Sequence, residues 1–193
     1  MISGCKLWAD RKTFSVQTNN SVEALLRRWS GKNRGFLETC GPTSAVNVLD
    51  ALGVPTAITS PKFASVQPED FLTLWMNDPA NLPGLKVPDD RPTNEYAYAY
   101  PNAIGKVFGA SALYLEGQGF DQIAAMVTSG RGAMICLVNP GHFLAVVAYD
   151  DQTKELIYRD PWPNRTQTDG FNLRMGRSEF ESNVKPYAVV FSA

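Results

Sequence analysis

Residues 39–53 decide the fold: they read Thr-Cys-Gly-Pro-Thr-Ser-Ala-Val-Asn-Val-Leu-Asp-Ala-Leu-Gly. The stretch predicts a helix that ends at Gly53, because glycine accepts the left-handed conformation that closes a helix and Pro55 follows closely. Pro42 suits the first turn, where a backbone N–H has no helical partner to lose. Apolar residues cover a broad face, so we expect this helix to be central and largely buried. They are Ala45, Val46, Val48, Leu49 and Leu52.

Cys40 lies at the N-terminal edge of this helix. The positive end of the helix dipole and the unpaired N–H groups of the first turn favour a thiolate, so the position predicts a lowered pKa for Cys40. The backbone N–H of Cys40 can also receive the negative charge that develops on a carbonyl oxygen during acyl transfer. The alternative is that Cys40 is a small buried residue that packs the start of the helix.

The other two cysteines are Cys5 and Cys136. They form no Cys-x-x-Cys pair, which argues against a disulfide framework or a cysteine-rich zinc site. At least one of the three thiols must be unpaired within the chain, as in a reducing compartment or at a working thiol. Cys136 lies inside an apolar run and is interpreted as core, whereas nothing around Cys5 assigns it a role.

Apolar residues at helical spacing come first along the chain, and strand-like runs follow. This order predicts an α+β fold with helices and strands segregated. We expect a single catalytic domain over 1–193, with a proline-rich loop inserted around 77–95. The expected helices cover 20–30, 69–76, 100–108 and 120–129, and the expected antiparallel strands cover 133–138, 142–149, 155–160 and 187–191.

His142 is the only histidine, so a cysteine–histidine mechanism must use it or have no histidine base. It begins a strand after the turn Asn139-Pro140-Gly141, which places it at the rim of the sheet. If strands 142–149 and 155–160 pair antiparallel, the numbers of facing residues sum to about 302 to 304. Asp160 then lies near His142, where a carboxylate can hold one imidazole nitrogen protonated while the other takes the thiol proton.

Several of these residues also have a structural interpretation. A lone histidine such as His142 is often structural, and Asp160 begins an Asp-Pro dipeptide, which favours turns. Tyr96, Tyr98 and Tyr100 alternate along the chain. They either form an aromatic wall for a sugar or peptide or pack on the core.

Carboxylates in the proline-rich region offer a speculative metal site. Asp78, Asp89 and Asp90 can gather Ca²⁺, because loop carboxylates are the ligands that calcium prefers. Their spacing matches no EF-hand, so the alternative is a solvated acidic loop. No other cofactor is expected.

Three short motifs resemble papain-like cysteine peptidases, specifically the C39-like branch that includes the bacteriocin-processing peptidases of double-glycine leaders. Residues 38–45, Glu-Thr-Cys-Gly-Pro-Thr-Ser-Ala, are similar to the nucleophile box. Residues 141–150, Gly-His-Phe-Leu-Ala-Val-Val-Ala-Tyr-Asp, resemble the histidine strand, and 158–162, Tyr-Arg-Asp-Pro-Trp, resemble the terminal Asp-Pro box. The resemblance implies a papain-like fold, with the Cys40 helix packed against the sheet that carries His142 and Asp160, and hydrolysis of amide bonds through a thioester.

The chain departs from this family at the oxyanion hole. The family usually places a glutamine several residues before the cysteine, and no glutamine occurs between Gln17 and Cys40. Asn33 can stand in, because its side-chain amide offers the same kind of N–H donor. We therefore expect the oxyanion to bind the backbone N–H of Cys40 and the Asn33 side chain.

The net charge of −1 implies no general attraction to nucleic acid or to an anionic membrane. The first ten residues lack the apolar core of a signal peptide, and no stretch approaches the ~20 apolar residues that span a bilayer. We expect a monomer made in the cytoplasm without a signal peptide, with delivery to the cell wall or periplasm by another route as an option.

These observations predict a cysteine peptidase or amidase with a Cys40–His142–Asp160 triad. The expected partner is a peptide, namely a peptidoglycan stem peptide, as for a phage lysin (endolysin) or a delivered antibacterial effector. Two alternatives remain: a thiol-dependent transpeptidase or deamidase of a protein or small peptide, and a non-catalytic binding module that keeps the fold.

Overall fold

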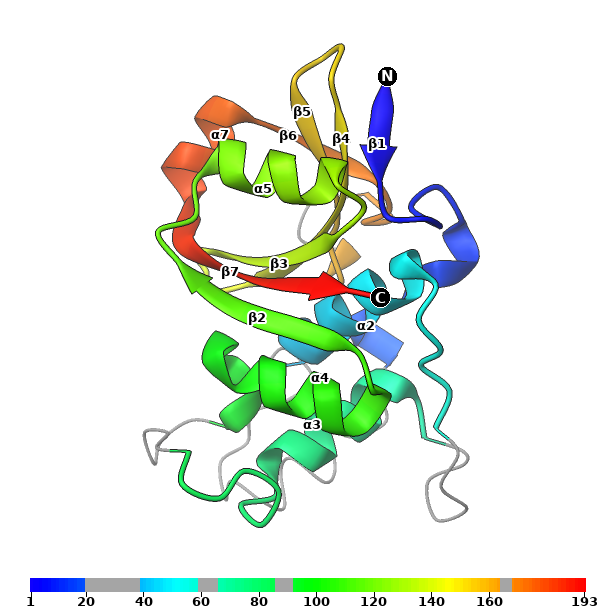
Figure 1. The fold of residues 1–193 in the computed structure, drawn as a ribbon, viewed down its shortest axis with the longest axis vertical. Helices are drawn as coiled ribbons and strands as arrows, with labels where there is room; N and C mark the ends of the chain where they lie inside the picture. The colour runs from blue at the N-terminus through cyan, green and yellow to red at the C-terminus, as the bar shows by residue number, and fades with distance from the viewer. Residues whose placement is uncertain (20–38, 59–65, 86–91, 164–167) are drawn as a thin grey trace.

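The structure is a computed structural model, and it describes residues 1–19, 39–58, 66–85, 92–163 and 168–193. Its centre is an antiparallel sheet in the order β2-β7-β3-β4-β5-β6, with β1 paired to β4 (Figure 1). The strands are β1 (Ile2–Gly4), β2 (Ser111–Glu116), β3 (Gly132–Leu137), β4 (Phe143–Asp150), β5 (Glu155–Arg159), β6 (Leu173–Gly176) and β7 (Val184–Ser192).

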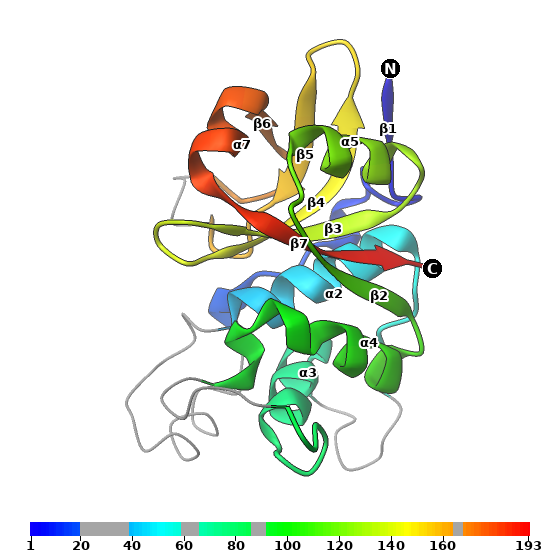
Figure 2. The same cartoon turned by 60° about the vertical axis from the view of Figure 1, so that its left-hand side comes forward.

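Helices cover both faces of this sheet, as Figure 2 shows. One face packs against α2 (Cys40–Leu52) and, at strand β2, against α4 (Tyr100–Phe108), and α3 (Pro68–Asn77) packs on α2. The other face packs against α5 (Phe120–Thr128) and α7 (Arg177–Asn183). Short 3-10 helices are η1 (Arg11–Thr13), η2 (Gln17–Asn19), η5 (Thr93–Glu95) and η6 (Ala97–Ala99).

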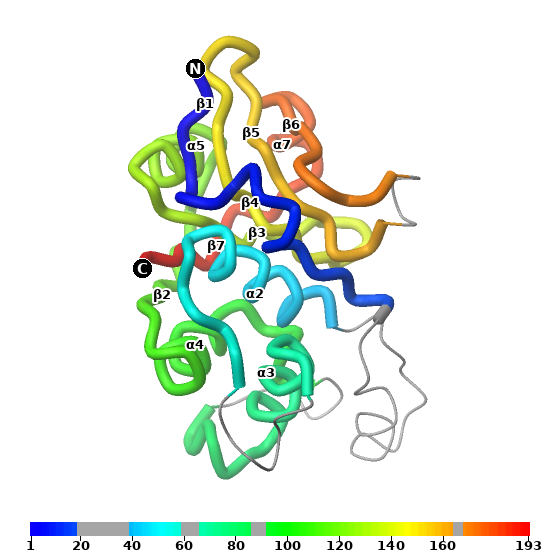
Figure 3. The backbone as a smooth tube through the Cα atoms, turned by 90° about the vertical axis from the view of Figure 1, so that its right-hand side faces the viewer, coloured from blue at the N-terminus to red at the C-terminus, as the bar shows by residue number. Residues whose placement is uncertain are grey.

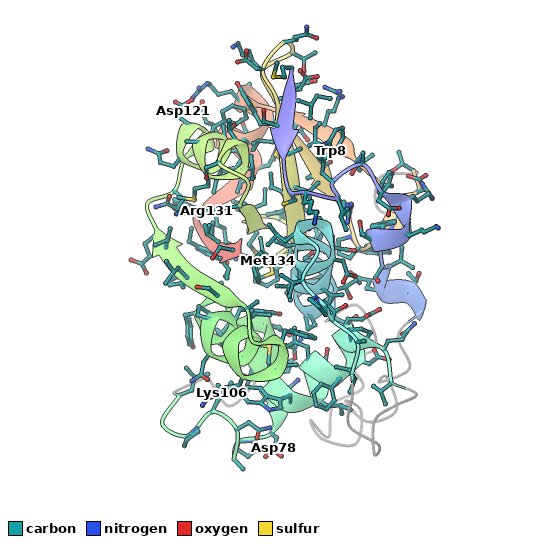
Figure 4. The ribbon with its side chains drawn as sticks, turned by 45° about the vertical axis from the view of Figure 1, so that its right-hand side comes forward. Trp8, Asp78, Lys106, Asp121, Arg131 and Met134 are labelled. Atoms are coloured by element: carbon teal, nitrogen blue, oxygen red, sulfur yellow. The ribbon has the colours of Figure 1, made fainter. Side chains whose placement is uncertain are left out.

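The buried strands β3 and β4 contribute side chains to two hydrophobic cores, one on each face of the sheet, because successive side chains of a strand point to opposite faces. Met134 and Cys136 join the core on the α2 side, whereas Ala133 and Ile135 join the core on the α5 side. Figure 4 shows Met134 between the sheet and α2. The helix α2 is buried along almost its whole length, as its broad apolar face predicts.

The N-terminal segment runs from β1 past the end of α2, as Figure 3 shows, and the fully buried Arg159 at the end of β5 holds it there. The Arg159 guanidinium donates to the carbonyl oxygens of Trp8 at 3.0 Å and Asn47 at 3.2 Å, and to Thr13 Oγ1 at 2.8 Å. It also lies over the Phe171 ring, 5.3 Å from the centroid. One side chain thus joins β5, α2 and residues 8–13.

The expected α+β architecture, with the Cys40 helix against an antiparallel sheet, is confirmed. Helices 69–76, 100–108 and 120–129 match α3, α4 and α5 closely, and the four expected strands match β3, β4, β5 and β7. The sheet is nevertheless larger than expected, since β1, β2 and β6 were not predicted. The expected helix at 20–30 lies outside the described residues.

Candidate active site

The first turn of α2 is fixed against the start of β4. Ser44 Oγ donates to the carbonyl oxygen of Phe143 at 3.0 Å, and the backbone N–H of Phe143 lies against the Cys40 thiol. Cys40 itself is 7% exposed. Because Phe143 follows His142 directly, this contact brings the cysteine to the strand end that carries the only histidine.

Gly41 allows the close approach of three neighbours. A Cβ atom placed on Gly41 would lie 2.1 Å from Tyr100 Oη, 2.9 Å from the Asn94 carbonyl oxygen and 3.1 Å from Phe143 Cδ2. The Tyr100 hydroxyl donates to that same carbonyl oxygen at 2.7 Å. A glycine is therefore required beside Cys40, because any larger residue would push Tyr100 and Phe143 apart.

His142 and Asp160 form a buried pair at the rim of the sheet. His142 Nε2 lies 2.7 Å from Asp160 Oδ1, and the two residues are 3% and 0% exposed. The Trp162 backbone N–H donates to the same carboxylate oxygen at 2.9 Å, and its ring meets the imidazole edge-on at 6.0 Å between centroids. With Nε2 protonated toward Asp160, Nδ1 is the imidazole nitrogen that can accept a proton.

Backbone hydrogen bonds hold both members of this pair. The His142 carbonyl accepts from the N–H of Leu137 at 2.8 Å, and the Asp160 N–H donates to the Gly170 carbonyl at 2.8 Å. The β4–β5 register runs from Ala145↔Arg159 to Asp150↔Glu155, so the facing residue numbers sum to 304 or 305, close to the expected value. The hairpin therefore brings Asp160 beside His142.

The pKa of Cys40 moves opposite to the sequence-based expectation. Burial raises the pKa of the Cys40 thiol to about 12, and the N–H groups of Phe143 and Gly41 only partly offset this effect. The neighbouring Cys136 and Glu95 add to the increase. The expectation of a lowered pKa was wrong, because it considered the helix terminus and not the loss of water around the sulfur.

Of the remaining predicted site residues, the structure describes only Asp78. Asn33, Asp89 and Asp90 lie outside the described residues, so the oxyanion role of Asn33 and the calcium site stay predictions. Asp78 accepts from the N–H of Ala80 at 3.0 Å after the end of α3. Within the described ranges, no three His, Cys, Asp or Glu side chains form a group that could hold a metal ion.

Gln17 is a residue of this region that the sequence reasoning passed over. It is buried, and its backbone N–H donates to the carbonyl of Pro161 at 2.8 Å, directly after Asp160. Two residues earlier, Ser15 exchanges hydrogen bonds with the Asn47 side chain of α2, at 2.7 and 3.0 Å. Residues 15–17 thus lie between α2 and the loop that carries Asp160. The sequence gives no sign of this position, because Gln17 is far from Cys40 along the chain.

The sequence profile of the Peptidase_C39 like family matches residues 14–185, which is most of the chain and includes Gln17, Cys40, His142 and Asp160. The chain belongs to the Peptidase_C39 like family. Membership supports cysteine peptidase activity, in agreement with the resemblance drawn from the three motifs. No curated protein is detectably similar in sequence to this C39-like chain.

Two solved structures of C39-like proteins are similar to this chain. One is titled a putative C39-like peptidase from Bacillus anthracis, with 16% identity, a TM-score of 0.49, and coverage of 81% of this chain and 89% of that chain. The other is the N-terminal peptidase C39 like domain of a toxin secretion ATP-binding protein from Vibrio parahaemolyticus, with 11% identity, a TM-score of 0.46, and coverage of 81% and 97%. Among the described residues, no helix is long and apolar enough to cross a membrane.

Proposed function

We propose that this C39-like chain is a cysteine peptidase in which Cys40 is the nucleophile, His142 the base and Asp160 the residue that orients the base. The buried hydrogen bond between His142 Nε2 and Asp160 Oδ1 carries this proposal. A buried carboxylate beside the imidazole suits a base that must become positively charged, because Asp160 stabilises the imidazolium that forms.

The chemistry begins with a neutral thiol, because burial raises the pKa of Cys40 to about 12. His142 Nδ1 takes the thiol proton as the sulfur bonds to the amide carbonyl carbon. The tetrahedral intermediate then loses the amine, which leaves with the proton from the imidazolium, and a thioester remains. His142 next deprotonates a water molecule that attacks the thioester, releasing the carboxylic acid and restoring the thiol.

The oxyanion that forms in both steps needs N–H donors. The backbone N–H of Cys40 is at the first turn of α2, where helical N–H groups have no partner in the helix. Gln17 is a candidate second donor, since its segment is fixed both to α2 and to the loop that carries Asp160. This assignment places at Gln17 the role that the sequence alone gave to Asn33.

A peptidoglycan stem peptide is the substrate we propose. The test is incubation of purified cell walls with the protein and with Cys40→Ala, followed by mass analysis of the released fragments. New peptide ends made by the wild type alone support the proposal. Walls left intact by both proteins, together with cleavage of a peptide library by the wild type, would reject the wall substrate and keep the peptidase. New cross-links or deamidated products without cleavage would favour the transpeptidase or deamidase instead.

A further inference from the structure

A bulge distorts β7, which β3 separates from β4, the strand that follows His142. Strands β3 and β7 pair regularly as far as Ile135↔Ala188, and the next pair is Leu137↔Val184. Three residues of β7, Lys185 to Tyr187, therefore stand opposite Cys136 alone. Cys136 in turn pairs with Phe143, the residue after His142. Bulges re-aim side chains and are common next to active sites.

The bulge directs Lys185 toward the turn before His142. Lys185 Nζ lies 4.0 Å from the point where Gly141 would carry a Cβ atom, and 6.0 Å from the centre of the Tyr187 ring. Tyr187 packs on the α2 side of the sheet, and its hydroxyl meets the thiol of Cys136. The half-buried Lys185 thus lies with its ammonium beside the turn that precedes His142.

Among the described residues, Lys185 has no carboxylate partner, a property that it shares with Lys6, Lys12, Lys106 and Arg131. Arg11, Lys154, Arg174 and Arg177 each pair with a described aspartate or glutamate at 3.0 Å or less. In the part of the chain that the structure describes, no aspartate or glutamate pairs with Lys185. A cation held in place at the edge of a site, without a protein counter-charge, is suited to a negative group of a ligand.

Aromatic rings continue from this cation away from His142. Tyr187 contacts Tyr114 at 5.7 Å between ring centroids, Tyr114 contacts Tyr98 at 6.4 Å, and Tyr98 contacts Tyr96 at 5.5 Å. Tyr98 is 39% exposed, whereas Tyr100 is completely buried. The tyrosines at 96 and 98 therefore belong to a row that reaches the surface, and the third belongs to the core. Such a row offers flat, partly polar contact area to a peptide.

We propose that Lys185 is a specificity-determining residue that binds a carboxylate of the peptide substrate close to the scissile bond. The inference rests on the proposed peptidase function and extends it to the class of substrate: a peptide with a free carboxylate, either terminal or on an acidic residue. The tyrosine row takes the neighbouring part of the peptide.

Alkylation of Cys40 tests, without any substrate, whether the positive charge of Lys185 attracts an anionic reagent to the thiol. The rates of modification by iodoacetate and by iodoacetamide are measured at pH 8.5 and low salt, with peptide mapping of the labelled cysteine. Lys185→Gln should lower the iodoacetate-to-iodoacetamide ratio at Cys40 about five-fold, because one nearby charge attracts the anionic reagent only. Lys185→Arg should keep the ratio, and so should Lys154→Gln, whose lysine pairs with Asp151 on a distant turn.

The outcomes separate this inference from the proposed function. An unchanged ratio in Lys185→Gln, with Cys40 labelled by both reagents, overturns the role of Lys185 and leaves the nucleophile in place. Cleavage of a peptide substrate by Cys40→Ala at the wild-type rate overturns the nucleophile, and the inference with it.

A synthetic stem pentapeptide, L-Ala-γ-D-Glu-L-Lys-D-Ala-D-Ala, then identifies the carboxylate. Its glutamate α-carboxylate and its C-terminal carboxylate are amidated in turn. Lys185→Gln should raise KM about ten-fold with little change in kcat, and amidation of the recognised carboxylate should remove that difference. Equal KM values for both proteins on all cleaved peptides contradict the inference.

Discussion

His142 Nε2 and Asp160 Oδ1 lie 2.7 Å apart in the core of the protein, and the N–H of Trp162 donates to the same oxygen. The pair joins the beginning of β4 to the end of β5. In the proposed mechanism, imidazole Nδ1 is then the atom that exchanges a proton with Cys40. One end of the ring would be oriented by Asp160, and the other would carry out the chemistry.

Asp160→Asn should lower kcat about 10³-fold with little loss of stability. The amide can still accept from the Trp162 N–H, so the loop keeps its shape, but it cannot stabilise an imidazolium. Steady-state kinetics on a cleaved peptide measure the effect, and circular dichroism checks the fold. Activity within a few-fold of wild type would mean that Asp160 is structural.

Gly41→Ala should destabilise the protein by about 1–3 kcal/mol, because the new Cβ would lie 2.1 Å from Tyr100 Oη. Tyr100→Phe removes that hydroxyl. The double variant should therefore recover part of the loss, although the Asn94 carbonyl remains 2.9 Å away. Urea unfolding of the two single variants and the double variant measures the coupling, and strictly additive losses would show that this contact is unimportant.

Arg159→Lys should lower the free energy of unfolding by about 3 kcal/mol. A lysine keeps the charge but cannot reach the carbonyls of Trp8 and Asn47 together with the Thr13 hydroxyl. Activity should fall with stability, because Gln17 follows the segment that Arg159 holds. Lys154→Arg, at an exposed ion pair, is the control. Full activity in a destabilised Arg159→Lys protein would show that the hydrogen bonds of Arg159 are not needed to position the candidate active site.

Alkaline pH should destabilise the protein through its buried thiols. Burial raises the pKa of Cys40 to about 12, whereas the unfolded thiol ionises near its ordinary value of 9.0. The unfolded state therefore holds fewer protons between these values, and stability falls as pH rises. From pH 8 to pH 10 the fall due to Cys40 should be about 1.4 kcal/mol. Cys40→Ala should show a correspondingly smaller fall in urea unfolding, and an equal fall in both proteins would refute the raised pKa.

Local sequence patterns were sufficient to predict the helix and the strands that form the centre of the candidate site. The Gly-Pro pair after Cys40 and the glycine at 53 define α2, and hairpin counting places Asp160 beside the single histidine. Long-range features had no such signal. Arg159 looks like an ordinary strand-end arginine until the segment at 8–13 folds over it. The bulge at Lys185 exists only through its pairing with β3.

Burial explains the one clear error at the site. A sequence shows that Cys40 begins a helix, but it does not show that Phe143 and Tyr100 close around the sulfur. The short strand β1 was missed for a similar reason, since three residues carry no period of their own and gain their structure from β4. Gln17 was missed because 22 residues separate it from Cys40, among them the long stretch 20–38.

The central claim is that Cys40 is the cysteine that forms the thioester. Incubation of the wild type, Cys40→Ser and Cys5→Ala with a peptide library, with new peptide ends counted by mass spectrometry, tests it most directly. Cys5 is a buried thiol whose Sγ faces the Arg131 carbonyl at 3.4 Å, so its variant controls for the loss of a core cysteine. We expect new ends from the wild type and Cys5→Ala and none from Cys40→Ser. Cleavage by Cys40→Ser at the wild-type rate would contradict the account.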